Sequence, residues 1–184
     1  MTYEEYFEWS NKRFKEGLSS GDNHSESMLN YTKLGIARTR RGLKISPIDS
    51  ELVNLLQNSK VKYAVIITEI WCGDAGNTTP FIHKNLNEAG IENKVMLRDK
   101  HPEIMENYLT NGGKSIPIVV FFNENFEELA VWGPRPAPAQ KMVMDRKKEE
   151  TPEDYDSFAI KLQKWYIEDS YQTTGNEIKE LISK

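Results

Sequence analysis

The sequence predicts an α/β protein in which a small mixed sheet is flanked by helices on both faces. Short apolar runs rich in β-branched residues, at 64–67 and 116–122, are separated by longer segments in which apolar residues recur at helical spacing. Such alternation is typical of strands joined by crossover helices. A turn at 123–125 leads into an alternating segment at 126–132, which we expect to return as an antiparallel strand.

Helices are expected before the first strand. Aromatic residues between positions 3 and 14 recur at roughly helical spacing and predict a first helix, and a second helix is expected over 27–38. The segment TRRGLK at 39–44 is interpreted as a basic turn, which is either a solvated charge cluster or a site for an anion or an acidic partner. Ser46 as the cap and Pro47 at the first helical position predict the start of a third helix.

The central segment of the chain alternates strands and helices. The run at 64–67 has no polar face, so we expect a central parallel strand that is covered on both sides. A helix over 74–87, a shorter strand at 94–98 and a short helix over 102–109 are predicted to follow. The strand at 116–122 has a proline at its mouth, where a missing N–H donor does no harm.

The last segment of the chain is predicted to be helical after an irregular loop. The segment 133–138 is too rich in proline for the sheet, and its Arg135 is expected to hydrogen-bond a carboxylate or backbone carbonyls. Helices are predicted over 139–148, 154–171 and 176–181. The aromatic stripe of the longest one is interpreted as core packing.

These elements predict three regions of a single compact domain. A chain of 184 residues is long enough to bury a substantial interior. Residues 46–150 are expected to form the α/β core, residues 1–45 a helical extension packed on that core, and residues 151–184 a second helical extension. The sequence carries no signal for an oligomeric state.

The composition argues against several classes of partner. With 38% hydrophobic and 28% charged residues, the chain has the composition of a globular protein with a solvated surface. Its formal charge of -4 gives no electrostatic reason to bind nucleic acid or an anionic membrane. The N-terminus MTYEEYFEW lacks the features of a signal peptide and no apolar run reaches membrane-spanning length, so we expect a cytoplasmic protein.

Cys72 is the only cysteine of the chain. One thiol excludes an intramolecular disulfide, a redox couple of two cysteines and a cysteine-rich zinc site. The three histidines, His24, His83 and His101, fall in separate predicted elements without ligand spacing. We therefore expect neither a metal nor a cofactor.

The position of Cys72 favours a functional role over its commonest alternative, a buried small apolar residue. The cysteine stands between Trp71 and Gly73, where a predicted strand ends and a helix begins. Free N–H groups and the helix dipole lower the pKa of a thiol at such a position, whereas the carboxylate of Asp74 raises it unless Asp74 caps the helix and points away. We expect a modest net lowering of the Cys72 pKa.

Several segments together resemble the thioredoxin superfamily, and within it a bacterial branch with the motif WCGDA. Trp71-Cys72-Gly73 stands where thioredoxins carry the start of WCGPC, and Pro80 stands where they have the proline of the active-site helix. Ile116-Pro117 stands where they place a cis-proline before a strand, and the residues at 121–125 are similar to the strand and turn that follow. The resemblance covers about 46–148 and implies a thioredoxin-like fold.

The resemblance also implies a site, with Cys72 as the nucleophile. The substrate groove implied around it consists of Trp71, Gly73, Asp74, Ala75, Ile116 and Pro117. If Pro117 is cis and does not merely start a strand, the backbone of Ile116 lies beside Cys72 and can pair with an extended substrate chain. Trp71 is expected to be either a flat contact surface or a core residue.

Three positions depart from the thioredoxin pattern. Ala75 replaces the second cysteine, so no internal thiol can resolve a mixed disulfide and the dithiol route is excluded. Ile66 stands in place of the buried acid six residues before the first cysteine, and Asp74 stands in place of the motif proline.

Three functions remain open on these grounds. In the first, Cys72 alone forms a mixed disulfide with a protein or a low-molecular-weight thiol, and an external thiol resolves it. In the second, the chain keeps the fold and the groove as a binding module without redox turnover. In the third, Cys72 is a sensor that is oxidised reversibly to sulfenic acid.

Overall fold

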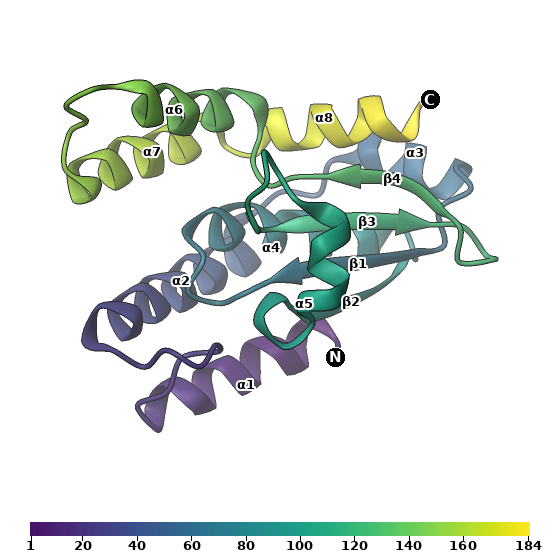
Figure 1. Ribbon diagram of the computed structural model, residues 1–184. Coiled ribbons are helices and arrows are strands. Elements are labelled where there is room, and N and C mark those ends of the chain that lie inside the picture. Colours follow the sequence, from purple (N-terminus) through teal and green to yellow (C-terminus); the bar gives the residue numbers. More distant parts are fainter.

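The structure is a computed structural model that describes all residues from Met1 to Lys184. Eight helices and four strands form it (Figure 1). The helices are α1 (Tyr3–Lys15), α2 (Glu26–Ile45), α3 (Ser50–Asn58), α4 (Gly73–Glu88), α5 (Pro102–Met105), α6 (Ala137–Lys148), α7 (Tyr155–Asp169) and α8 (Gln172–Ile182). The strands are β1 (Tyr63–Thr68), β2 (Glu92–Leu97), β3 (Ile118–Phe122) and β4 (Glu128–Trp132), and short 3-10 turns cover Arg98–Lys100 and Glu106–Tyr108.

The sheet has the strand order β2-β1-β3-β4 and is mixed, as predicted. β1 pairs in parallel with β2 and antiparallel with β3, and β4 returns antiparallel to β3. Successive residues of β1 point to opposite faces, so Ile66 lies in one core and Ile67 in the other. Both side chains are almost completely buried. The absence of a polar face in β1 follows from this two-sided burial.

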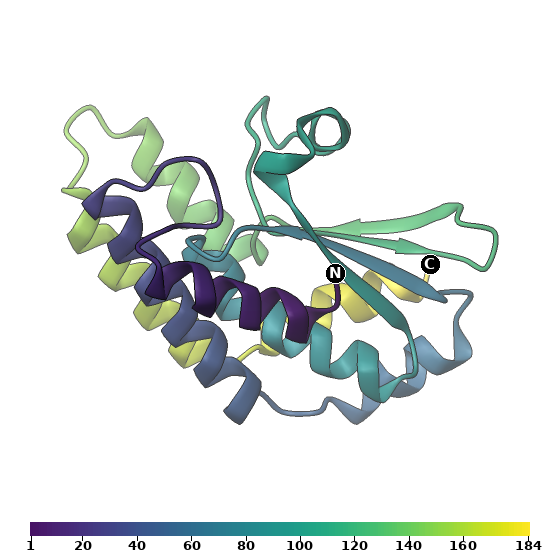
Figure 2. The same ribbon diagram turned by 90° about the horizontal axis from the view of Figure 1, so that it is seen from below.

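The two faces of the sheet are covered very unequally (Figure 2). The larger core lies under α1, α3, α4 and α8 and includes Tyr3, Leu52, Phe81 and Ile178. The smaller core lies under α5 and the 3-10 turn that follows it, with Met105 completely buried there. Cys72 belongs to the smaller core. It therefore lies on the thinly covered side of the sheet.

The prediction of a basic turn at 39–44 was wrong, because α2 continues through this segment to Ile45. Gly42 does not break the helix. It allows α2 to pack against α4, since a Cβ atom at Gly42 would lie 2.7 Å from the ring of Pro80. Gly35 permits a similarly close approach nearer the N-terminus of α2, where a Cβ atom would lie 1.7 Å from the carbonyl oxygen of Ile70.

The start of the third helix also differs from the prediction. Asp49 is the cap of α3, and its carboxylate accepts hydrogen bonds from the N–H groups of Glu51 and Leu52, each at 3.1 Å. Ser46 instead ends α2, and its hydroxyl has no hydrogen-bond partner. A carboxylate at the cap also interacts with the helix dipole, which favours Asp49 over Ser46.

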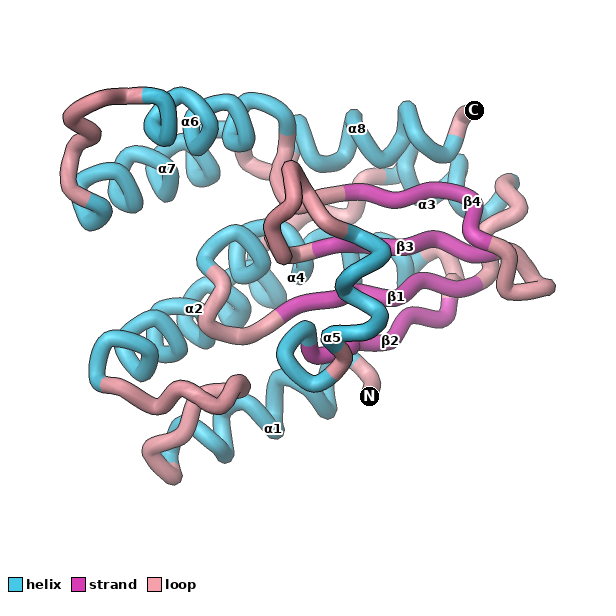
Figure 3. Tube along the Cα trace, viewed as in Figure 1, coloured by secondary structure: helices cyan, strands magenta, loops and turns pink.

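This arrangement brings three loops to one end of the sheet. β1 leads into the turn before α4, and the chain before β3 runs as a loop from Leu109 to Pro117 (Figure 3). The loop after β4 leads to α6, and α7 then returns across the first turn of α4. None of the helices is long and apolar enough to span a membrane.

Candidate functional site

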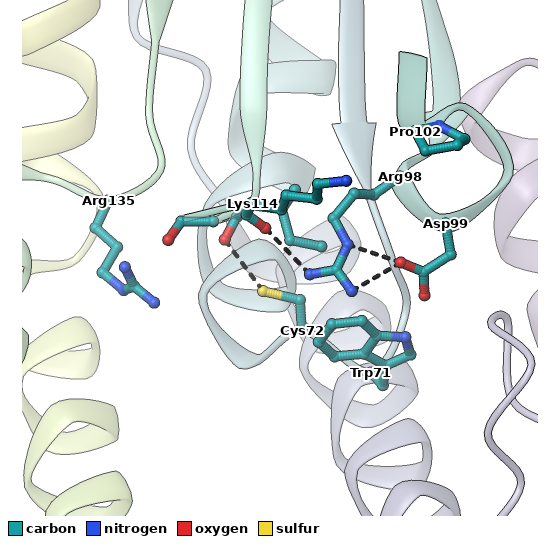
Figure 4. Close-up of a pocket in the computed structure, with 9 residues that line it drawn as sticks. Trp71, Cys72, Arg98, Asp99, Pro102, Lys114 and Arg135 are labelled. Carbon is teal, nitrogen blue, oxygen red and sulfur yellow. Dashed lines mark hydrogen bonds and ion pairs between the residues drawn. The ribbon is translucent and has the colours of Figure 1, made fainter. Parts of the chain in front are cut away.

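Cys72 is the N-cap residue of α4, directly after the turn that leaves β1. Its side chain makes no capping hydrogen bond. The Sγ–H group instead donates to the carbonyl oxygen of Ile116 at 3.3 Å (Figure 4). The peptide bond between Ile116 and Pro117 is cis. The structure thus brings Cys72 and Ile116 together, although they are 44 residues apart in the sequence.

The Cys72 thiol is not activated in this structure. Burial raises its pKa to about 12, and the nearby carboxylate of Asp74 adds to the rise. The N–H groups of Ala75 and Asp74 and the positive charge of Arg135 act in the opposite direction but do not compensate. The expected modest lowering of the Cys72 pKa is therefore wrong. The helix terminus is present, but the thiol is only 7% exposed and loses more by desolvation than it gains there.

Asp74 points toward the interior and does not cap α4. One carboxylate oxygen lies 2.7 Å from Nε of Arg135, and the other accepts a hydrogen bond from the hydroxyl of Tyr166 at 2.9 Å. Burial raises the pKa of the Asp74 carboxyl, and both partners limit the rise. The expectation that Arg135 would bind a carboxylate is confirmed. Tyr166 is predicted only as a core residue, although a tyrosine hydroxyl in a buried stripe needs a partner.

Arg38 of α2 is a second cation beside this turn, and the sequence pattern did not point to it. Its stem packs where Gly76 has no side chain, and a Cβ atom at Gly73 would lie 2.6 Å from Nη1 of Arg38. The side chain is partly buried, yet its guanidinium forms no hydrogen bond or ion pair with the protein. Burial lowers the pKa of Arg38, and the charge of Asp74 opposes this. The two glycines of the first turn of α4 were the available signal.

A basic cavity of about 480 Å³ opens on one side of Cys72. Its wall includes Trp71, Arg98, Lys114 and Ile116 (Figure 4). The guanidinium of Arg98 lies over the Trp71 ring, 4.7 Å from its centroid, and donates to the carbonyl oxygen of Lys114 at 3.1 Å. Trp71 is half-buried. One of its faces is thus covered by a cation and is not a bare contact surface.

A second cavity, of about 890 Å³, lies on the opposite side of the turn, between α2 and α7. Trp71, Cys72 and Arg135 border both cavities. Gly73 and Asp74 border the second one, whereas Ala75 and Pro117 are buried and line neither. The predicted groove residues therefore gather around the cysteine, but two of them support the site from beneath.

A buried acid does lie near the site, at a position that the motif comparison does not indicate. Ile66 belongs to the apolar core, whereas Glu69 is completely buried after the end of β1. Its carboxylate accepts hydrogen bonds from the hydroxyl of Ser20 and from the N–H group of Asp99, the latter at 3.0 Å. Burial raises the Glu69 pKa. Glu69 ties the turn to its neighbours and does not contact Sγ.

The structure contains no group of three or more histidine, cysteine, aspartate or glutamate side chains that could hold a metal ion. His83 instead donates a hydrogen bond from Nε2 to the carboxylate of Glu4 at 2.9 Å, and its Nδ1 lies 2.8 Å from Oδ1 of Asn93. These contacts join α4 to α1 and β2.

Comparison with known proteins gives a family and a fold. Residues 21–151 match a protein-family model described as thioredoxin. The 1.5 Å crystal structure of PA1234, a protein of unknown function from Pseudomonas aeruginosa, matches with a TM-score of 0.55 and 17% identity over 100% of this chain and 98% of that one. The crystal structure of an HIV epitope-scaffold matches with a TM-score of 0.54, also at 17% identity and over 100% and 98% of the two chains. No curated protein matches. The observed fold is thus thioredoxin-like. Sequence identities of 17% to these two structures support the fold alone and no particular function.

Proposed function

The chain belongs to the thioredoxin family, and we propose that within this family it acts as a binding protein and not as a disulfide reductase. The observation that supports this is the state of Cys72: a buried thiol with a pKa raised to about 12. At neutral pH such a thiol is protonated almost completely, and the protonated form does not attack a disulfide. Ala75 offers no second thiol. We place the chain in the branch with the WCGDA motif.

The ligand that we propose for the basic cavity is an extended, acidic segment of another protein. The N–H group of Ile116 donates no hydrogen bond within the chain, so it is available to a strand that pairs with this edge. Arg98 and Lys114 flank the edge, where Arg98 is paired with Asp99 at 2.7 Å and Lys114 with Glu106 at 2.6 Å. Acidic side chains of such a segment would take the place of these two carboxylates. Trp71 supplies an aromatic surface beside them.

A second candidate is exchange by a single cysteine with a protein or a low-molecular-weight thiol. It is favoured by the position of Sγ on the wall of two cavities, with N–H groups of α4 directed at it. In this reaction the Cys72 thiolate attacks one sulfur of a disulfide, forms a mixed disulfide and releases the other sulfur as a thiolate. An external thiol then restores Cys72. A ligand would first have to expose Cys72 and draw Asp74 away from it.

The rate of Cys72 alkylation by iodoacetamide as a function of pH separates the two candidates. A binding protein with a protonated thiol is expected to react slowly at neutral pH, with a rate that still rises above pH ~10, beyond the midpoint of an ordinary thiol near 8.5. A midpoint below that of an ordinary thiol would contradict the proposal and favour exchange.

Partner binding gives the second arm of the test. Binding of an isolated partner should survive Cys72→Ser, because no covalent step is required, and should be lost in Trp71→Ala. Loss of binding in Cys72→Ser with retention in Trp71→Ala would favour exchange.

A further inference from the structure

The cavity between α2 and α7 has apolar side walls. Met28 and Leu34 of α2 face Ile160 and Ile167 of α7 across it. Three of these side chains are strongly exposed: Leu34 by 48%, Ile160 by 71% and Ile167 by 51%. Exposed apolar side chains that gather around one hollow, and are not scattered singly, indicate a surface that binds something.

The base of this cavity is fixed by polar contacts between α7 and α4. Tyr166 is bonded to Asp74, and the side-chain amides of Asn77 and Gln163 exchange two hydrogen bonds, each at 2.9 Å. The first turn of α4 closes the inner end. The cavity is thus a pocket between two tethered helices, and its volume of about 890 Å³ lies within the roughly 300–1,000 Å³ of small-molecule sites.

The inner end of the cavity carries an uncompensated positive charge. Arg135 and Asp74 neutralise one another in their ion pair at 2.7 Å. Arg38 is left without a partner, although its five N–H donors lie at a partly buried position and burial disfavours an unpaired charge. Lys164, which also borders the cavity, is paired with Glu168 at 3.7 Å, and the exposed Asp156 forms no ion pair with Arg38. An anion at Arg38 would therefore satisfy both the charge and the donors.

We propose that the α2–α7 cavity binds a small organic carboxylate with an apolar body, with the carboxylate at Arg38 and the body between the two helices. A planar guanidinium matches a carboxylate in two parallel hydrogen bonds, which favours this head group over a hydroxyl or an amide. The tethered walls favour a small molecule over a partner helix, which is about 10 Å across and would have to separate α7 from α4. The two cavities share Trp71, Cys72 and Arg135, but Arg38 and the apolar side walls belong to the α2–α7 cavity alone. The proposed binding requires no reaction of Cys72.

The test is isothermal titration calorimetry of the full chain at neutral pH with sodium decanoate, below its micelle concentration, and with decan-1-ol as the uncharged comparison. Decanoate is expected to bind at one site. Arg38→Gln should weaken it roughly tenfold or more, because a charge-assisted pair is lost. The matched control is Arg41→Gln, which removes an exposed arginine of the same helix outside the cavity and should change the affinity less than about twofold. Decan-1-ol should respond to neither substitution.

A second variant keeps the proposal falsifiable if Arg38→Gln perturbs the fold. Ile160 is 71% exposed, so Ile160→Glu should leave thermal unfolding unchanged while it places a like charge on the apolar wall and abolishes decanoate binding. The proposal is overturned if decanoate does not bind, or if it binds equally well to the wild type, Arg38→Gln and Ile160→Glu. It is also overturned if an amphipathic helical peptide binds across α2 and α7 while decanoate does not.

Discussion

Two arginines from different elements reach the first turn of α4, and they differ in what they bind. Arg135 comes from the loop before α6 and is paired with Asp74 at 2.7 Å, with its second contact to Gln140 at 3.0 Å. Arg38 comes from α2 and is paired with no group of the protein. Both oxygens of the Asp74 carboxylate thus have partners, Arg135 and Tyr166, and neither is paired with Arg38. One of these cations therefore stabilises the site, whereas the other is available to a ligand.

The largest expected effect comes from breaking the paired side. Arg135→Met keeps an unbranched apolar stem but leaves the buried Asp74 carboxylate without its cation, which should lower the free energy of unfolding by about 3 kcal/mol. Arg38→Met removes no partner from any group and should change it by less than about 1 kcal/mol. Urea unfolding of the two variants beside the wild type measures the difference. Equal losses would show that Arg38 also has a structural role.

A smaller effect is expected from the pH dependence that the thiol creates. The folded pKa of Cys72, about 12, lies above that of an unfolded cysteine near 8.5. The contribution of the neutral thiol to the free energy of unfolding is therefore fully present below pH ~8.5. It is lost as the pH rises toward 12, by up to about 1.4 kcal/mol per pH unit. Relative to Cys72→Ala, the free energy of unfolding of the wild type, measured by urea unfolding, should fall by about 2 kcal/mol between pH ~8.5 and 10. Parallel stability curves would contradict the burial of the thiol.

The charge of Asp74 is expected to slow the reaction of Cys72 with iodoacetamide about tenfold. Asp74→Asn removes the carboxylate, which acts second only to burial in raising the pKa of the thiol. A like charge at this distance is worth on the order of one pKa unit. Iodoacetamide should therefore react about ten times faster with Asp74→Asn than with the wild type at neutral pH. Asp156→Asn, at the outer rim of the larger cavity, is the matched control and should leave the rate unchanged.

Much of the fold was predictable because its signals are local. The apolar run of β1, the hairpin before β4 and the proline before β3 each depend on a few adjacent residues. The C-terminal end of α2, at Ile45, could not be predicted from such local signals. Gly42 is unfavourable in a helix by propensity, and its close packing against Pro80 of α4, which explains why a glycine stands there, cannot be read from the local sequence.

The residues of the site likewise fall into those that local motifs predict and those that only the packing of helices brings to it. Trp71, Cys72 and Ile116 could be identified because they belong to short motifs. Tyr166 and Arg38 could not, because they reach the turn only through the packing of whole helices, and Tyr166 is 92 residues from Asp74. The pKa of Cys72 was misjudged for the same reason. The helix terminus can be read from the sequence, but the burial that outweighs it depends on α5 and the loop before β3.

The smallest expected effect is on decanoate affinity, and it tests whether Arg135 alone keeps Asp74 away from Arg38. Tyr166→Phe removes one hydrogen bond to the carboxylate, at 2.9 Å, and should cost about 1–2 kcal/mol of unfolding free energy. Asp74 should stay with Arg135, because the ion pair is intact, so decanoate affinity should change less than about twofold. If the carboxylate instead turned to Arg38, the variant would neutralise that cation from within and decanoate binding would fall as in Arg38→Gln. That result would assign Tyr166 the task of keeping Arg38 available.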